Sequence, residues 1–102
     1  MLIYNMTMNV DESIHLKWKN WVSEHYIPSM LNTNKFSKVL VTQVLGNEEI
    51  VGLTYSIQFT APTESHLEAF KEAHQAKVES KFQQFKGEVV FFSSVLKVVS
   101  EH

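Results

Sequence analysis

The sequence predicts an α+β fold in which four β-strands and two helices follow one another in the order β-α-β-β-α-β. Residues 2–10 place only apolar side chains on one face, at the even positions, and Ile3 with three polar side chains on the other, as a half-buried strand does. Residues 11–31 and 63–86 instead repeat their apolar side chains at three- and four-residue steps, as amphipathic helices do. At 102 residues the chain has the length of one domain, so we expect residues 1–102 to fold as a single unit.

The first helix begins where Asp11 or Ser13 can accept a hydrogen bond from a free N–H group, and it contains both tryptophans. At about 100° per residue its apolar side holds Ile14, Trp18, Trp21, Val22 and His25, with His15 and Tyr26 at its edge. Pro28 disfavours helical geometry at the residue before it. We therefore expect the main helix to end near His25 and a further short turn to run through residue 31.

Residues 36–45 and 50–59 are predicted to form two strands. The polar segment 46–49 between them has hairpin length, so the strands should pair antiparallel. In the second of these strands the odd-numbered residues are apolar and the even-numbered ones are small or polar. The odd-numbered side chains should therefore point at the helices.

The second helix should begin after Thr63, which can cap it, and end at Gly87. Its apolar stripe consists of Leu67, Phe70, His74, Val78, Phe82 and Phe85. The charged tract 71–86, which includes Glu72 and Glu79, is interpreted as a solvated helix face. Residues 89–99 form the last strand, and their few polar side chains predict a strand covered on both faces.

This order of elements is that of the ferredoxin-like arrangement, a four-stranded antiparallel sheet with two helices on one face. The other face should be open and half polar, with apolar residues such as Val39 or Val41 among the following polar side chains: Asn5, Thr7, Thr54, Ser56 and Gln58. Such a face is more often an interface than a surface exposed to water. We therefore expect a homodimer that forms through the open face of the sheet.

Composition excludes several classes of partner and site. The chain has no cysteine, so disulfides and thiolate metal sites are excluded. All nine basic residues are lysine, and without arginine the chain lacks the planar fork that grips phosphate and guanine, which argues against nucleic acid. No signal peptide and no apolar run of about 20 residues is present, so we expect a cytoplasmic protein with no membrane partner.

Four motifs, spread over the chain, together resemble a small bacterial family known only as a domain of unknown function. They are I-Y-N at residues 3–5, W-x-x-W at Trp18 and Trp21, H-x-x-P at His25 and Pro28, and G-x-T-Y-S at residues 52–56. The resemblance implies a dimeric α/β barrel, in which two ferredoxin-like sheets pack face to face and a cavity lies between each sheet and its helices. It implies no activity.

Our first functional hypothesis is a homodimer that binds a small, largely apolar molecule in this cavity or serves as an accessory domain. Its candidate ligand-binding residues are Asn5, Trp18, Trp21, Tyr55 and Phe70. For the aromatic members the alternative is plain core packing. A further alternative is that dimerisation is the whole role.

The second hypothesis is an enzyme, because the chain is also loosely similar to cofactor-free antibiotic-biosynthesis monooxygenases and to haem-degrading monooxygenases of the same superfamily. Its candidate catalytic residues are His74 and His25, which could handle a proton in a monooxygenase-like or isomerase-like reaction. The structural alternatives are a neutral His74 bonded to the sheet or to Tyr4 or Tyr55, and a His25 that caps helix carbonyls.

Neither a cofactor nor a metal is expected. Glu64 occupies the position at which the haem degraders carry a tryptophan, and no arginine is present to pair with haem propionates. His15 and His25 would lie about 15 Å apart along one helix, and His66 and His74 about 12 Å apart, too far for either pair to share an ion.

Overall fold

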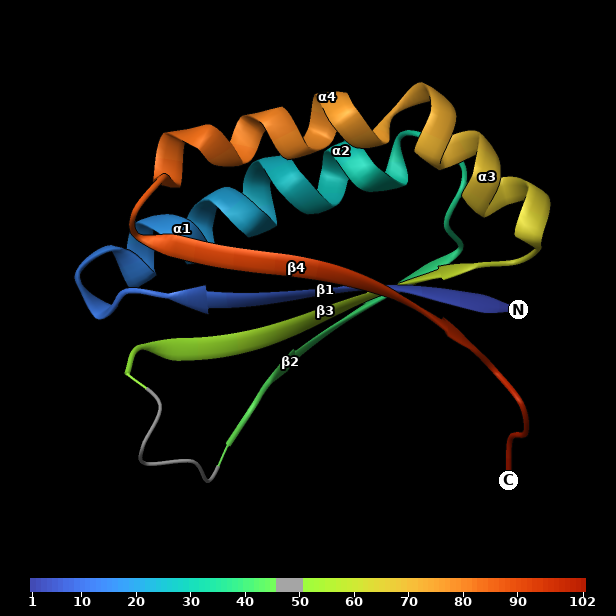
Figure 1. Cartoon of the computed structure of the whole chain (residues 1–102), viewed down its shortest axis with the longest axis horizontal. Helices are drawn as coiled ribbons and strands as arrows, with labels where there is room; N and C mark the ends of the chain where they lie inside the picture. The colour runs from blue at the N-terminus through green and yellow to red at the C-terminus, as the bar shows by residue number, and fades with distance from the viewer. Residues whose placement is uncertain (46–50) are drawn as a thin grey trace.

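A computed structural model of the chain describes residues 1–45 and 51–102 and shows two layers, an antiparallel sheet and a layer of helices on one of its faces (Figure 1). The strands are β1 (Leu2–Val10), β2 (Lys38–Gln43), β3 (Leu53–Ala61) and β4 (Val89–Lys97), arranged in the order β2-β3-β1-β4. The predicted α+β, ferredoxin-like class is confirmed. The predicted connection at residues 46–49 lies outside the described residues.

The central strand β1 pairs antiparallel with β3 and β4, so that Met6 lies opposite Ile57 and Ser93. The even-numbered residues of β1 from Tyr4 to Val10 and the odd-numbered residues of β3 from Tyr55 to Ala61 are buried beneath the helices. The predicted direction of the β3 side chains is therefore confirmed. Strict alternation fixes it, because a shift of one residue would expose every apolar side chain.

The first helical segment consists of a 3₁₀ turn (Glu12–Ile14), α1 (His15–Trp21), a π-helical turn (Val22–Tyr26) and α2 (Ile27–Leu31). The predicted short turn through residue 31 is present as α2, but the predicted end near His25 is wrong, because Ile27 is helical and its N–H donates to the carbonyl of Val22, five residues earlier. This wide turn accommodates Pro28, whose ring would clash with the carbonyl four residues earlier in a regular helix. The extra residue turns Tyr26 inward and His25 outward.

The second helical segment is broken at one point. It consists of α3 (Glu64–Ala73), α4 (Gln75–Ser80) and a 3₁₀ turn (Lys81–Phe85), and His74 joins α3 to α4 with φ −129° and ψ −29°. The side chain of Thr63 caps α3, as predicted, by accepting a hydrogen bond from the N–H of His66. Gly87, at φ +88°, directs the chain into β4.

Two predictions about the outer strands are wrong. Val39 and Val41 pair with Phe59 and Ile57 and so lie on the helix side of the sheet, whereas Leu40 lies on the open face. The apolar run at 39–41 has no period of two, and pairing with β3 decides its direction. β4 is an edge strand, and its open face is uncovered in the single chain.

The core fills the space between the sheet and the helices, and no polar or charged residue is fully buried in the described part of the chain. Its largest side chains are Trp18, Tyr4, Tyr26, Phe59, Phe70 and Phe85. Among the described residues, no helix is both long and apolar enough to cross a membrane.

Candidate functional site

A polar cluster joins β1 to α4 inside the otherwise apolar interface between sheet and helices. The Tyr4 hydroxyl donates to Oε1 of Glu79 at 3.3 Å. The Gln75 amide donates to the Tyr4 oxygen at 3.3 Å and to Oε1 of Glu79 at 3.2 Å. Burial raises the pKa of Tyr4 to about 12, a hydrogen bond with Ser93 opposes this shift, and the charge of Glu79 adds to it. Tyr4 is therefore a protonated donor throughout the physiological pH range.

Tyr26 brings a second hydroxyl to the same interface, and its ring packs on Phe59 and Phe82 at centroid distances of 5.6 and 5.2 Å. Its side chain is 1% exposed, and its hydroxyl has no hydrogen-bond partner among the described residues. Burial, followed by the nearby Tyr4 and Glu79, raises the pKa of Tyr26 well above its ordinary value. A buried hydroxyl without a partner lowers the stability of a folded protein by about 1–3 kcal/mol. The described residues therefore leave the hydrogen bond of Tyr26 unmade at a cost to the fold.

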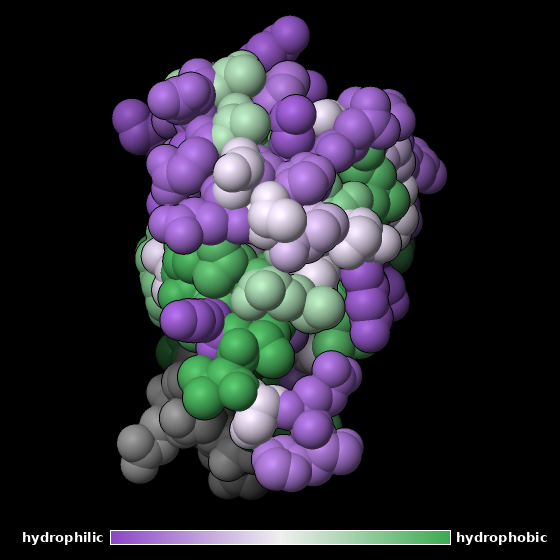
Figure 2. All heavy atoms as spheres, turned by 90° about the vertical axis from the view of Figure 1, so that its right-hand side faces the viewer, coloured by the Kyte–Doolittle hydropathy of each residue, from purple (hydrophilic) through white to green (hydrophobic). Residues whose placement is uncertain are grey.

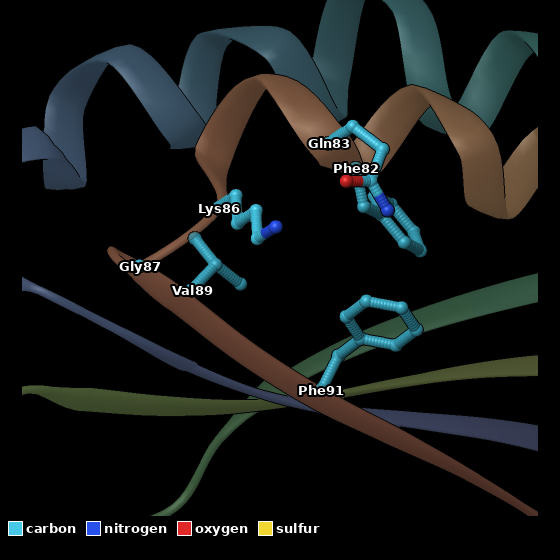
Figure 3. A pocket seen from close by; sticks show the side chains of 6 residues that line it. All are labelled: Phe82, Gln83, Lys86, Gly87, Val89 and Phe91. Carbon is cyan, nitrogen blue, oxygen red and sulfur yellow. The ribbon is translucent and has the colours of Figure 1, made fainter.

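A hollow of about 190 Å³ opens at the edge of the sheet between β4 and the end of the second helical segment. Phe82 and Phe91, whose rings meet edge to face at 4.6 Å, form its apolar wall, and Val89 lies on the strand side. Figure 3 shows the Lys86 side chain extending from the end of the helix into the space above β4, with the Gln83 amide close to Phe82. Phe82 packs on both Phe91 and Tyr26, so its ring joins the wall of the hollow to the Tyr26 ring.

A third polar group lies further along the interface. Nε2 of His15 and the Tyr55 hydroxyl are 2.6 Å apart, and the Trp18 ring packs on Tyr55 at 4.8 Å. The Trp18 Nε1 group is buried without a partner in the described part of the chain. Sequence reasoning placed His15 only at the edge of the helix and did not propose it as a site residue.

The two candidate catalytic histidines lie apart from these groups. His25 is exposed on the outer side of the π-helical turn, and the prediction that it belongs to the apolar stripe is wrong for the reason given above. His74 is half-buried at the helix break and stacks on Phe70 at 6.3 Å. The partners foreseen for it are engaged elsewhere, because Tyr4 bonds to Glu79 and Tyr55 to His15.

The candidate ligand-binding residues divide into two groups. Trp21 packs on Tyr26 at 5.6 Å and Phe70 packs on Tyr4 at 5.3 Å, so both border the polar cluster. Trp18 and Tyr55 contact each other beside His15, as described. Asn5 lies on the opposite face of the sheet and is not part of the interface with the helices.

Sequence reasoning missed Tyr26 and Glu79 as site residues. Tyr26 was placed at the edge of the helix stripe, and Glu79 was assigned to the solvated tract. Glu79 in fact lies half-buried beside Val78 and faces Tyr4. Its place at the edge of the apolar stripe is the one signal that could have identified it.

The open face of the sheet carries a network of hydrogen-bonded polar side chains along its centre. Asn5 donates to Oγ of Ser94 at 3.3 Å and accepts from Ser56 at 2.5 Å, while Asn9 donates to Thr54 at 3.1 Å. Exposed apolar side chains flank this network, namely Leu40, Val90, Phe92 and Leu96. Figure 2 shows hydrophobic side chains gathered at the level of the sheet, below a mostly hydrophilic helix layer.

A second hollow, of about 380 Å³, lies at one end of the open face. Ile3, Lys38 and Thr60 line it from the sheet, and Val98 and Glu101 line it from the segment after β4. That segment runs away from the helices, and the C-terminus lies on the open side of the sheet (Figure 1). Of these two hollows, only the smaller one, at β4, is lined by residues of both a helical segment and a strand.

A sequence model of the family described as a domain of unknown function (DUF4286) matches residues 1–99. Among curated proteins, no sequence matches the chain.

Similar solved structures include HapK from Hahella chejuensis, with a TM-score of 0.68, 8% identity, and coverage of 100% of this chain and 97% of HapK. A candidate antibiotic biosynthesis monooxygenase from Deinococcus radiodurans has a TM-score of 0.66 and 10% identity, over 100% of this chain and 96% of that one. A dimeric ferredoxin-like protein from an uncultured marine organism has a TM-score of 0.65 and 14% identity, over 99% of this chain and 98% of that one. At these identities the likeness shows the fold.

Proposed function

The chain belongs to the DUF4286 family of domains of unknown function, and we propose that it is a homodimeric domain that binds a small, largely apolar molecule between its sheet and its helices. The hollow at β4 carries this proposal, because it places an aromatic wall of Phe82 and Phe91 beside hydrogen-bond donors at Gln83 and Lys86. About 190 Å³ corresponds to roughly six water volumes of ~30 Å³ each, which suits a molecule built on one ring.

The proposed dimer forms through the open face of the sheet, with a second copy of the chain as its partner. Val90 and Phe92 are 70% and 61% exposed there, which leaves a large apolar surface in water on an edge strand. The polar groups at the centre of the face already bond to one another, so a partner can cover them without leaving them unsatisfied. A neighbour of the same fold is described as a dimeric ferredoxin-like protein, which supports the proposal.

Strand β4 contributes to both the proposed dimer interface and the proposed binding site. The open side of this strand would lie in the dimer interface, and its helix side forms the wall of the hollow through Val89 and Phe91. A dimer would therefore hold in place the edge strand on which the ligand rests. Neither His25 nor His74 lines the hollow, so we assign them no part in binding.

Binding is tested by titrating the ¹⁵N-labelled protein with ethylbenzene and following backbone amide shifts. We expect saturable shifts at Phe82 and Phe91. Val89→Phe should fill the hollow and abolish these shifts, whereas Val95→Phe, on the same side of the same strand but outside the hollow, should leave them unchanged. Shifts confined to the open face, or equal binding by the two variants, would contradict the proposed site.

A further inference from the structure

The polar cluster behind the hollow has hydrogen-bonding capacity that the described residues leave unused. Tyr4 and Gln75 both bond to Oε1 of Glu79, and no described residue bonds to its other oxygen, Oε2. The Tyr26 hydroxyl has neither donor nor acceptor partner among the described residues. One carboxylate oxygen at the half-buried edge of this interface and one buried hydroxyl therefore have hydrogen-bonding capacity left.

These two groups lie in the same part of the interface. Tyr4 and Tyr26 pack on the same ring, that of Phe59, at 6.4 and 5.6 Å. Phe82, which contacts Tyr26, follows Glu79 by three residues, so both project from the same side of one helical segment. The effect of Glu79 on the pKa of Tyr26 agrees with this proximity.

The chemistry of the two groups selects among ligand types. A carboxylate would be repelled by Glu79. An ammonium group could donate to both Glu79 and the Tyr26 oxygen, but the apolar interface would remove the hydration of its full charge. A carbonyl could accept from Tyr26 but could give nothing to Glu79. A hydroxyl does both, because its oxygen accepts while its hydrogen is donated.

We propose that this site recognises the hydroxyl group of a neutral phenol or alcohol, whose oxygen accepts a hydrogen bond from Tyr26 and whose hydrogen is donated to Glu79. The inference rests on the proposed function and names the ligand class of the same site. The apolar body of the ligand occupies the hollow, and the Phe82 ring, which lines the hollow and contacts Tyr26, turns aside to admit the hydroxyl.

Access is available along the edge of the sheet. Gln75 and Glu79 are only half-buried, and Ser93, which bonds to Tyr4, is exposed on the helix side of β4. The cluster therefore meets solvent at the same edge at which the hollow opens.

The test compares 4-ethylphenol with ethylbenzene, which lacks only the hydroxyl, and with 4-ethylbenzoate, which carries a charge in its place. We expect 4-ethylphenol to bind at least about tenfold more tightly than ethylbenzene, the factor that a charge-assisted hydrogen bond supplies. Tyr26→Phe and Glu79→Gln should each reduce this preference. Tyr55→Phe removes a hydroxyl that bonds to His15, outside the site, and should leave the preference unchanged.

Each outcome decides between the two proposals. Equal affinity of the wild-type protein for 4-ethylphenol and ethylbenzene, or a preference that survives both site variants, would overturn the hydroxyl site and leave the hollow as a binding site. Tighter binding of 4-ethylbenzoate would also overturn it, in favour of an acid held by Lys86. If none of the three probes shifts the amides of Phe82 and Phe91, the proposed function fails as well.

Discussion

Replacing Tyr26 with phenylalanine should make the ligand-free protein more stable. The substitution keeps the ring, with its contacts to Trp21, Phe59 and Phe82, and removes only the hydroxyl. That hydroxyl is buried and has no partner among the described residues. Removing an unsatisfied group from the interior eliminates its desolvation cost and breaks no hydrogen bond to a described residue.

The expected gain in the free energy of unfolding is about 1–3 kcal/mol, the usual cost of a buried hydroxyl left unpaired. For a domain of this size each kcal/mol raises the melting temperature by about 4–8 °C. Tyr4→Phe is the matched control, because the Tyr4 hydroxyl bonds to Glu79 and Gln75. Its removal should lower the stability by about 0.5–3 kcal/mol.

Urea unfolding of the two variants and the wild-type protein, at one protein concentration and without ligand, measures both changes. A fixed concentration is needed because dimerisation makes the apparent stability depend on it. Loss of stability in Tyr26→Phe would refute the reasoning, because it would mean that the hydroxyl has a partner in solution. A stabilised variant with weakened 4-ethylphenol binding is the pattern of a group kept for function at the expense of the fold.

Four further results are expected. Sedimentation should give about twice the 11.8 kDa protomer mass for the wild-type protein. Phe92→Glu should sediment as a protomer, because the dimer would bury the new charge, and a monomeric wild type would contradict the proposed interface. Gly52→Ala should lose about 1–3 kcal/mol in urea unfolding, because Gly52 has φ +85° and a Cβ there would lie 2.8 Å from the Val10 carbonyl oxygen; an unchanged midpoint would count against this geometry. The pKa of Tyr4 rises from 10.0 to about 12 on folding, so its contribution to the free energy of unfolding is complete below pH 10 and should fall by about 2 kcal/mol between pH 10 and 12. Urea unfolding over this pH range should show a smaller decline for Tyr4→Phe. His74→Phe should change the stability by less than about 1 kcal/mol and leave 4-ethylphenol binding unchanged, and loss of binding would return His74 to the site.

The sequence predicts best those strands in which nearly every residue fits one alternating pattern of apolar and polar side chains. In β1 and β3, strict alternation over nine residues each leaves one register that buries the apolar side chains. The outer strands lack this redundancy. In β2 the apolar run at 39–41 fits either face, and in β4 apolar side chains on both faces were interpreted as full coverage, although the strand lies at the edge of the sheet.

In the first helix, one irregular turn of the backbone makes the prediction of inward-facing residues from helical periodicity fail. Pro28 correctly indicated an irregular helix, but the sequence does not tell whether the helix ends before the proline or accommodates it by widening one turn. The chain widens at Val22–Tyr26 and remains helical to Leu31. Beyond that turn, every side chain is displaced around the axis by about one residue, which exchanges His25 for Tyr26 on the inner face.

The candidate site was hidden from the sequence for a related reason. Periodicity places the Cβ of Tyr4 or Tyr26 on an apolar face, and the ring alone justifies that place. The use of the hydroxyl at the far end depends on what another element brings to it, and Glu79 comes from a helix 75 residues away from Tyr4. The sequence analysis proposed histidines as catalytic residues because the charge of histidine changes near neutral pH. Tyr26 instead places a buried neutral hydroxyl in this interface, and a ligand that bonds to it gains a hydrogen bond that the described residues do not supply.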